Sequence, residues 1–230
     1  MSNISMLNIY VTKIVNTKLS DLIDHSKKFL SEARINKIQN MHYEIDKKRS
    51  ILSYMLLLFG LINDYSISID DIEIDVDYFG KPFLVNNDLF FNYSHSGDYI
   101  VCAISNKKVG IDIEKYRKMR EIPVNLMHKK EKYKYTFINN KEKYFFDIWS
   151  LKESYLKYLG IGLSKGINFF YFEFNADFKI NVVRNDGKNF YGKIQYVYID
   201  PKYVSSICYD EKKINSIKQV EVKNIYRRLI

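Results

Sequence analysis

The chain has 230 residues, 47% of them hydrophobic, which fits one large or two small globular domains and excludes a disordered chain. Its formal net charge of +9 favours a polyanionic or phosphate-bearing partner, although a solvated lysine-rich surface gives the same balance. Two cysteines, Cys102 and Cys208, are too few for a disulfide framework, so we expect both to be reduced and to pack as small apolar residues.

We expect neither a signal peptide nor a membrane-spanning segment in this sequence. The opening MSNISMLNIY lacks the basic start and the long apolar run of a signal peptide. The longest apolar run, Met55 to Phe59, falls far below the ~20 residues that span a bilayer. We therefore expect a reduced, soluble, cytoplasmic protein with no membrane partner.

Apolar patterns in the first half of the chain predict one strand, two helices and a series of strands. The first strand is expected at 7–14. A helical period predicts helices over 19–40 and 46–60, the second ended by Gly60. The strands that follow are expected at 72–76, 89–93, 99–105 and 109–114.

The second half repeats this order of elements. After a helix over 141–159, strands are expected at 169–174, 178–184, 191–199 and 203–209. The runs YIVCAIS (99–105) and YVSSICY (203–209) are alike. We therefore predict an α+β fold, a pseudo-dimer of two similar α+β halves, each an antiparallel sheet packed with a long helix. The halves are expected at 1–108 and 109–230, and clefts between such halves are common ligand sites.

The run VGIDIEK (109–115) places two carboxylates on one face of a predicted strand. Side chains at i and i+2 of a strand share a face, so Asp112 and Glu114 project to the same side. Carboxylates spaced about 6–7 Å along a strand repel each other unless a cation or water lies between them. Such oxygen ligands suit Mg²⁺. A polar strand face in water is the alternative, so this motif alone does not establish a metal site.

The stretch FDIWSLKESYLKYLG (146–160) has the apolar period of a buried helix, with Lys152 near the middle of the apolar stripe. Trp149, Glu153 and Lys157 are spaced i, i+4, i+8 along its border. A lysine inside the stripe must snorkel, lose its charge or meet an anion. If the stripe borders a cleft, we expect Lys152 and Lys157 to point at a bound phosphate, with Glu153 as a third carboxylate. A surface Glu–Lys pair beside a snorkelling Lys152 is the alternative.

The run FNYSHSGD (91–98) ends a predicted strand just before a glycine turn. Neighbouring strand residues point to opposite faces, so Ser94 and His95 do not form a nucleophile–base pair by themselves. Hydroxyl, imidazole and turn amide groups together suit an anion such as phosphate. A hydrogen-bonded strand end is the alternative.

Cationic and hydroxyl side chains earlier in the chain form another candidate anion site. Arg34 and Lys37 are spaced i, i+3 on a predicted helix, so they share a face. Arg49 and Ser50 lie near the start of the next helix, and Lys81 lies in the turn FGKPF. An arginine fork suits a phosphomonoester, although scattered solvent-facing charges would explain any one of these residues.

Four blocks carry a family resemblance: GKP (80–82), FNYSHSG (91–97), VGIDIEK (109–115) and WSLKESYLKYLGIGL (149–163). In this order and spacing they resemble the 4'-phosphopantetheinyl transferases. The likeness is greatest to the larger, monomeric class that activates surfactin-type peptide synthetases. The predicted helices and closing strands extend the likeness over nearly the whole chain.

That family transfers the 4'-phosphopantetheine arm of coenzyme A to a serine of an apo acyl or peptidyl carrier protein and releases 3',5'-ADP. The resemblance implies that Asp112, Glu114 and Glu153 hold Mg²⁺, or Mn²⁺, on the pyrophosphate. With a metal and a pyrophosphate there, we expect Glu153, directly or through water, to be the base for the carrier serine and Lys157 to stabilise the departing phosphate oxygen. Carriers of fatty-acid, polyketide and peptide synthesis are all left open.

The resemblance further implies a set of coenzyme A contacts. Lys152 and Lys157 are expected at the pyrophosphate, Lys81 is expected near the nucleotide, and Ser94 and His95 are expected at the coenzyme A phosphates. The residues expected at the 3'-phosphate are Arg34, Lys37, Arg49 and Ser50. The first predicted half would thus hold most phosphate contacts, and the second half would hold the metal ligands and the catalytic helix.

Two alternative functions follow from the same residues. A nucleic-acid-binding module would explain the +9 charge and 20 tyrosines, but not carboxylates that repel phosphate unless a metal is bound. An inactive coenzyme A-binding relative would not need Glu153 and Lys157 intact. The span 115–140, rich in lysine and tyrosine, is expected either to help dock an acidic carrier or to be a solvated loop.

Overall fold

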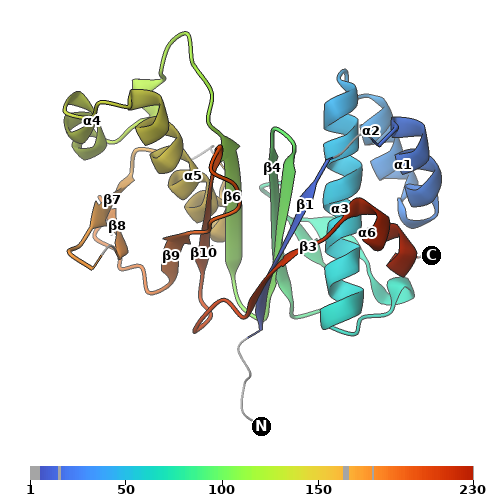
Figure 1. Ribbon diagram of the computed structural model, residues 1–230. Helices are drawn as coiled ribbons and strands as arrows, with labels where there is room; N and C mark the ends of the chain where they lie inside the picture. The colour runs from blue at the N-terminus through green and yellow to red at the C-terminus, as the bar shows by residue number, and fades with distance from the viewer. Residues whose placement is uncertain (1–5, 15–16, 163–165, 178, 230) are drawn as a thin grey trace.

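The computed structural model describes residues 6–14, 17–162, 166–177 and 179–229, and Figure 1 shows its elements along the chain. The helices are α1 (Leu19–Ser26), α2 (Glu32–Gln39), α3 (Glu44–Asp64), α4 (Lys129–Thr136), α5 (Lys141–Leu159) and α6 (Val222–Leu229), with short 3-10 helices η1 (Lys27–Phe29), η2 (Ile69–Asp71) and η3 (Val124–Leu126). The strands are β1 (Leu7–Lys13), β2 (Ile74–Val76), β3 (Pro82–Leu84), β4 (Phe90–Ser96), β5 (Tyr99–Ser105), β6 (Val109–Lys115), β7 (Phe170–Phe174), β8 (Ile180–Arg184), β9 (Lys193–Tyr196), β10 (Tyr203–Tyr209) and β11 (Ser216–Gln219). Each helix in these ranges is too short or too polar to cross a membrane.

The first half is built on a four-stranded sheet in the order β11, β1, β5, β4. Strand β5 pairs antiparallel with both β1 and β4, whereas β11 joins the edge of β1 in parallel. Helix α3 covers one face of this sheet, and its Leu52, Met55 and Leu56 are wholly buried in the shared core. Helices α1, α2 and α6 pack around α3. Because α3 has neighbours on so many sides, its sequence is apolar over most of its circumference.

The second half is built on a three-stranded sheet in the order β6, β10, β9, with β10 antiparallel to both neighbours. Helix α5 lies across this sheet and buries Ile148, Leu151 and Tyr155 against Phe170 of β7. Two small antiparallel hairpins, β2–β3 and β7–β8, complete the fold.

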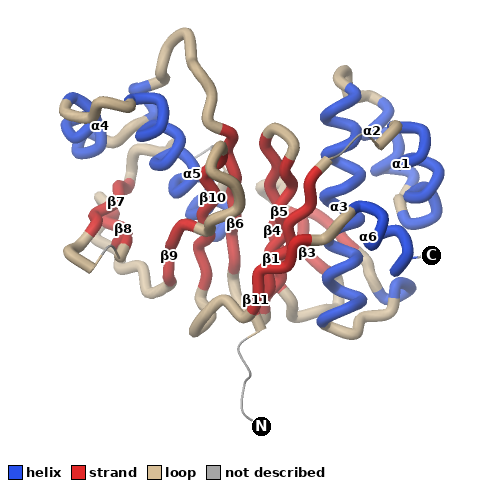
Figure 2. Tube along the Cα trace, viewed as in Figure 1, coloured by secondary structure: helices blue, strands red, loops and turns tan. Residues whose placement is uncertain are grey.

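The two sheets meet in a core between the halves. Val101 of the first sheet and Ile111 and Ile207 of the second are wholly buried in one apolar cluster. The order of layers is therefore helices, sheet, sheet, helix, as Figure 2 shows. This arrangement confirms the predicted α+β fold of two similar halves, each with a long helix on its sheet. The parallel strand β11 is the one departure from antiparallel pairing within the described sheets.

The predicted helix over 19–40 is divided into α1, η1 and α2. Leu30 has an extended backbone and ends the first part of the segment. Ser31 then caps α2, since its Oγ accepts a hydrogen bond from the backbone N–H of Arg34 at 3.3 Å. A serine in this position satisfies an otherwise unpaired amide at a helix start, so the local cap outweighs the continuous apolar period.

The prediction that Gly60 ends its helix is wrong, because α3 continues to Asp64. Gly60 instead permits close packing of the helix on the sheet. A Cβ at this position would lie 2.6 Å from Ile104 Cδ1 and 2.8 Å from Tyr10 Cε2. Both neighbours are wholly buried, so neither has room to move aside.

Gly60→Ala is therefore expected to lower the free energy of unfolding by about 1–3 kcal/mol through overpacking, although alanine is the better helix former. Urea unfolding followed by circular dichroism measures this difference. A variant at least as stable as the wild type would mean that the contact between α3 and the sheet relaxes without strain.

Several described elements were not predicted: β3, α4, β11 and α6, together with the short 3-10 helices η2 and η3. The predicted boundary between 108 and 109 falls in the turn before β6, and the division there stays a prediction. Strand β11 and helix α6, however, pack against β1 and α3 of the first half. Residue 178 of the predicted strand at 178–184, residue 163 of the fourth block and residues 1–5 of the opening stretch lie outside the described residues.

Candidate active site

Strands β4 and β6 lie side by side where the two halves meet, joined by side chains rather than by a backbone ladder. Asn92 Oδ1 accepts a hydrogen bond from the backbone N–H of Ile111 at 2.9 Å. Ser96 Oγ accepts one from the backbone N–H of Lys115 at 3.0 Å. Alternate residues of β4 thus face β6, as the two-residue period of a strand requires.

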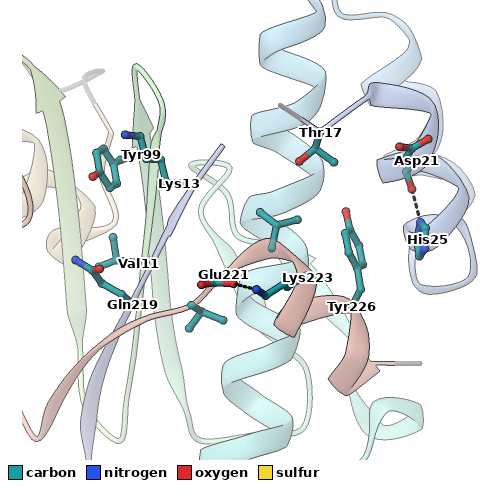
Figure 3. A pocket seen from close by; sticks show the side chains of 12 residues that line it. Val11, Lys13, Thr17, Asp21, His25, Tyr99, Gln219, Glu221, Lys223 and Tyr226 are labelled. Atoms are coloured by element: carbon teal, nitrogen blue, oxygen red, sulfur yellow. Dashed lines mark hydrogen bonds and ion pairs between the residues drawn. The ribbon is translucent and has the colours of Figure 1, made fainter. Parts of the chain in front are cut away.

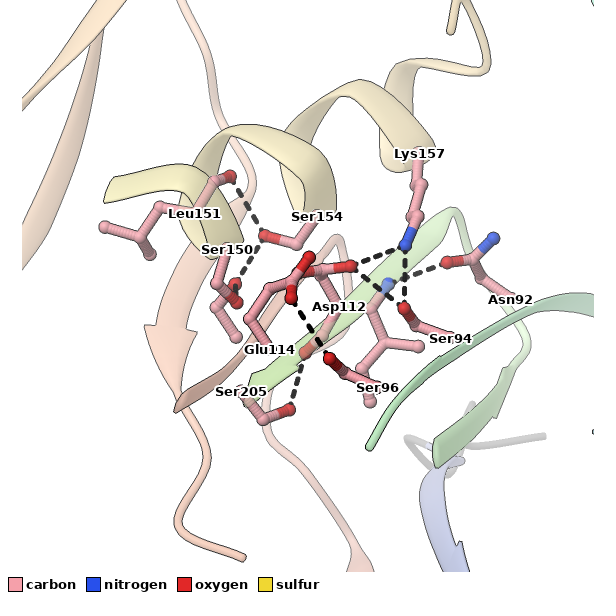
Figure 4. Close-up of polar contacts among 12 residues, drawn as sticks. Asn92, Ser94, Ser96, Asp112, Glu114, Ser150, Leu151, Ser154, Lys157 and Ser205 are labelled. Carbon is pink, nitrogen blue, oxygen red and sulfur yellow. Dashed lines mark hydrogen bonds and ion pairs between the residues drawn. The ribbon is translucent and has the colours of Figure 1, made fainter. Parts of the chain in front are cut away.

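The same face of β4 contacts the two predicted carboxylates of β6 (Figure 4). Ser94 Oγ donates to Asp112 Oδ1 at 2.9 Å, and Ser96 Oγ donates to Glu114 Oε2 at 3.1 Å. The structure therefore brings Ser94, Asp112 and Glu114 together, although they come from different halves. The motifs FNYSHSG and VGIDIEK form one site because their strands run alongside each other.

Helix α5 approaches β6 closely because residue 110 has no side chain. A Cβ on Gly110 would lie 2.2 Å from both the carbonyl oxygen of Ser154 and the backbone nitrogen of Tyr158. Buried hydroxyls fasten the helix further, since Ser206 Oγ of β10 donates to Ser154 Oγ at 2.9 Å and lies 3.0 Å from Ser150 Oγ. Together, these contacts fix the distance between helix α5 and strand β6.

Lys157 of α5 reaches the carboxylate pair from this position. Its Nζ donates to Asp112 Oδ1 at 2.6 Å and to Ser94 Oγ at 3.0 Å. Asp112 is only 3% exposed, and its other carboxylate oxygen, Oδ2, is buried with no hydrogen-bond partner among the described residues. A buried carboxylate oxygen without a partner is costly, so the chemistry of this position fits a cation or a hydrogen-bond donor.

Glu153 completes an acidic cluster, by which we mean Asp112, Glu114 and Glu153. Burial raises the pKa of Glu153, Lys157 partly opposes this, and the charges of Asp112 and Glu114 raise it further. Burial and the charge of Asp112 likewise raise the pKa of Glu114. Among the described residues, no three acidic, histidine or cysteine side chains already form a closed metal-binding group. The cluster nevertheless offers oxygen donors only, which fits Mg²⁺.

Positive charge gathers at the outer end of β4. The Arg49 guanidinium donates to the carbonyl of Gly97 at 2.7 and 3.2 Å and pairs with Asp46 at 2.9 Å. Partial desolvation and the nearby charges of Arg49 and Lys157 lower the pKa of His95. His95 is therefore near two predicted phosphate contacts, in surroundings that favour an anion.

The prediction for Lys152 is corrected by the structure. Lys152 is 1% exposed, and its Nζ pairs with Glu131 of α4 at 3.1 Å. The same ammonium donates to the carbonyls of Ile167 and Phe170 at 3.0 and 3.1 Å. Lys152 does point inward and does meet an anion, but the anion is an internal carboxylate, so the inference that it contacts the pyrophosphate is wrong.

Lys81 lies at the far end of α5. Its Nζ donates to the carbonyl of Lys157 at 2.5 Å and approaches that of Val109 at 3.4 Å, which ties the β2–β3 hairpin to the helix. Burial lowers its pKa to about 8. A cation at the C-terminal end of a helix also interacts favourably with the helix dipole.

The remaining predicted cations lie on α2 and at the start of α3. The Arg34 guanidinium stacks on the ring of Tyr54 at 4.3 Å and lies 3.5 Å from Tyr93 Oη of β4. Lys37 is exposed one turn later on α2, and Ser50 follows Arg49 on α3. Arg34 and Arg49 thus border β4, and the structure does not bring Lys37 into contact with it.

Ser96, Gly110 and Glu131 were not assigned to the site from the sequence. Ser96 could have been found, because it lies two residues after Ser94 and must share its face. Gly110 lies two residues before Asp112, and a glycine inside a strand often marks close approach of another backbone. No local pattern pointed to Glu131, whose partner lies 21 positions later in the sequence.

A cavity of about 760 Å³ lies elsewhere, between α1, β1, β11 and α6. Figure 3 shows Lys13, His25, Tyr99 and Tyr226 around it. None of the predicted site residues lines this cavity. The site on β4, β6 and α5 is identified by its carboxylate, hydroxyl and ammonium groups and not by the volume of a cavity.

Comparison with known proteins agrees with this geometry. Residues 20–107 match the family described as "4'-phosphopantetheinyl transferase, N-terminal", and residues 108–208 match the "4'-phosphopantetheinyl transferase superfamily". The chain is 28% identical over 184 residues to 4'-phosphopantetheinyl transferase Sfp of Bacillus subtilis (strain 168), covering 78% of this chain and 82% of that protein.

Two further relatives carry the same description. The transferase gsp of Aneurinibacillus migulanus is 38% identical over 136 residues, 56% of each chain, and psf-1 of Bacillus pumilus is 27% identical over 214 residues, 90% of this chain and 91% of that one. The two family matches together run from residue 20 to residue 208, across both halves of the fold. The chain therefore belongs to the 4'-phosphopantetheinyl transferase superfamily and is a transferase.

Proposed function

We propose that this enzyme transfers the 4'-phosphopantetheine arm of coenzyme A to a serine hydroxyl of an apo acyl or peptidyl carrier protein, with release of 3',5'-ADP. The proposal also includes dependence on Mg²⁺, which Mn²⁺ would replace, and action as a cytoplasmic monomer. The observation that carries it is the convergence of the acidic cluster with Lys157 and Ser94 where β4, β6 and α5 meet.

Asp112, Glu114 and Glu153 are the proposed metal ligands. The unsatisfied Oδ2 of Asp112 supports this assignment, because a hard cation would provide the partner that this oxygen lacks. A bound Mg²⁺ would neutralise charge on the pyrophosphate and orient the leaving group. Without a cation, a cluster of carboxylates would repel coenzyme A, which also argues against a nucleic-acid-binding role.

Glu153 is the proposed base for the carrier serine. Its raised pKa suits proton acceptance near neutral pH better than that of an exposed glutamate would. Lys157 has a partly exposed ammonium beside the cluster and is the proposed partner of the departing phosphate oxygen. Ser94 and His95 are the proposed contacts of the coenzyme A phosphates.

Arg34, Lys37, Arg49 and Ser50 remain proposed contacts of the 3'-phosphate. The position of Arg49 beside His95 supports its inclusion. Lys81 remains a proposed residue near the nucleotide, where its hydrogen bond to the Lys157 carbonyl would also hold the end of α5.

Incubation with coenzyme A, Mg²⁺ and a panel of apo carrier proteins tests the proposal. Intact-mass analysis is expected to detect a gain of about 340 Da on at least one carrier, the mass of the transferred arm. Chelation with EDTA is expected to abolish the gain, and excess Mg²⁺ or Mn²⁺ is expected to restore it. A carrier whose target serine is replaced by alanine serves as the control. If folded protein modifies no carrier, the inactive-relative alternative is favoured instead.

A further inference from the structure

Lys157 occupies the acidic cluster in this structure. Its ammonium lies 2.6 Å from Asp112 Oδ1, the same oxygen that Ser94 also bonds at 2.9 Å. One oxygen of Asp112 therefore has two partners, while Oδ2 has none among the described residues. The charge of Asp112 is thus neutralised from one side only.

The cluster needs such a counter-ion. The charge of Asp112 raises the pKa of Glu114, the charges of Asp112 and Glu114 raise the pKa of Glu153, and Asp112 is almost wholly buried. A buried carboxylate without a compensating charge costs several kcal/mol. Lys157 supplies that charge when no metal is bound.

Lys157 is also partly accessible from solvent. Its side chain is 26% exposed, whereas that of Asp112 is 4% exposed, so solvent or a ligand reaches the ammonium from one side. The long lysine side chain has several rotatable bonds, and its ammonium acts as a point charge without a fixed geometry. An anion next to His95 would therefore attract Lys157 away from Asp112.

We propose that Lys157 is an internal competitor of the divalent cation: it holds Asp112 until the coenzyme A pyrophosphate draws it off, so that cation and coenzyme A bind cooperatively. This inference rests on the proposed function and adds an order of events to it. Without coenzyme A, a cation must displace the ammonium from Asp112 and binds weakly. With coenzyme A, the ammonium finds phosphate oxygens and the carboxylate becomes available. By linkage, the cation tightens coenzyme A binding by the same factor.

A cation that touches both the cluster and the pyrophosphate would couple the two ligands even without Lys157. The two sources of coupling are separated by measuring cation affinity in the absence of coenzyme A. Loss of a competitor strengthens binding of the cation alone, whereas loss of an ordinary positioning residue leaves it unchanged or weakens it. The direction of the change therefore identifies the role.

The test uses Mn²⁺ as the probe, with binding to the full chain followed by electron paramagnetic resonance without coenzyme A or carrier. Lys157→Met removes the ammonium and keeps most of the side-chain length. We expect it to bind Mn²⁺ at least about fivefold more tightly than the wild type. Lys115→Met is the matched control, because it removes the same charge from β6 itself. Lys115 contacts Asp98 at 3.8 Å and not Asp112, so an affinity within about twofold of the wild type is expected.

An unchanged or weaker Mn²⁺ affinity in Lys157→Met would overturn the proposal, as would an equal gain in Lys115→Met. If Lys157→Met is unfolded without metal, its melting temperature is measured against added Mn²⁺. The proposal then expects Mn²⁺ to restore folding in Lys157→Met but not in the double variant Asp112→Asn, Lys157→Met. Failure of Mn²⁺ to restore the single variant would contradict it.

These outcomes are independent of the transfer assay. A wild-type protein that modifies no carrier would refute the proposed function but would leave the Mn²⁺ measurements intact. An active wild type whose Lys157→Met variant binds Mn²⁺ no better would keep the proposed function and refute the competition.

Discussion

Replacing Lys152 with methionine is expected to lower the free energy of unfolding by about 3–5 kcal/mol, because the change leaves a buried carboxylate unpaired. Glu131 is 1% exposed, and one of its oxygens, Oε1, already lacks a hydrogen-bond partner in the described part of the chain. The change also removes the hydrogen bonds that hold the carbonyls of Ile167 and Phe170 to α5. Guanidinium unfolding followed by tryptophan fluorescence measures the loss, since Trp149 lies on the same helix.

The double variant Lys152→Met, Glu131→Leu separates charge from packing. With both charges removed, most of the lost stability is expected to return, because no buried ion is left alone. Lys143→Met is the matched control on the same helix, where the exposed pair with Asp147 is expected to contribute less than about 1 kcal/mol. A Lys152→Met protein as stable as the wild type would show that Glu131 takes up a proton at no cost.

Gly110→Ala is expected to lower the free energy of unfolding by about 3 kcal/mol and to reduce transfer activity as well. The added Cβ would meet backbone atoms of Ser154 and Tyr158 at 2.2 Å, and backbone cannot turn aside as a side chain can. To fold at all, the variant must lift α5 from β6. That movement would carry Glu153 and Lys157 away from Asp112, and a shift of about 1 Å can cost 100-fold in rate.

Chemical denaturation and carrier-modification rates measure the two effects of Gly110→Ala. Gly187→Ala is the control. A Cβ at Gly187 would meet no neighbouring atom of the described residues, so this substitution lowers the free energy of unfolding only through the positive φ of 69°. About 1–2 kcal/mol of lost stability with unchanged rate is expected there. If Gly110→Ala retains the wild-type rate, the height of α5 above β6 does not determine the geometry of the site.

The carboxylates of the site could be predicted because each lies in a regular element. The two-residue period of β6 puts Asp112 and Glu114 on one face, and the helical period puts Glu153 and Lys157 near each other on α5. Gly160, with a φ of 74°, ends α5 where the sequence places a glycine after the last apolar residue. These features depend only on the spacing of residues within one strand or one helix, so the sequence pattern is sufficient to predict them.

Lys152 shows where local reasoning fails. The helical period of the apolar residues places Lys152 on the buried side of α5. A buried lysine requires an anion, and the structure does provide one. The period does not say which anion lies opposite. Glu131 belongs to α4, whose sequence KKEKYKYT has almost no apolar period, so nothing predicted a helix there. Two candidate anions, a ligand and an internal carboxylate, were therefore indistinguishable without the tertiary structure.

The parallel pairing of β11 with β1 has a consequence for the order in which the protein is made. Asn8 lies opposite Ser216, so residues near the two ends of the chain complete one sheet, and α6 then covers α3. Strand β11 follows the whole second half in the sequence, so β1 can pair with β5 during synthesis before β11 is available. The first sheet is thus completed only after the second half has been made, and part of α3 stays uncovered until α6 packs on it.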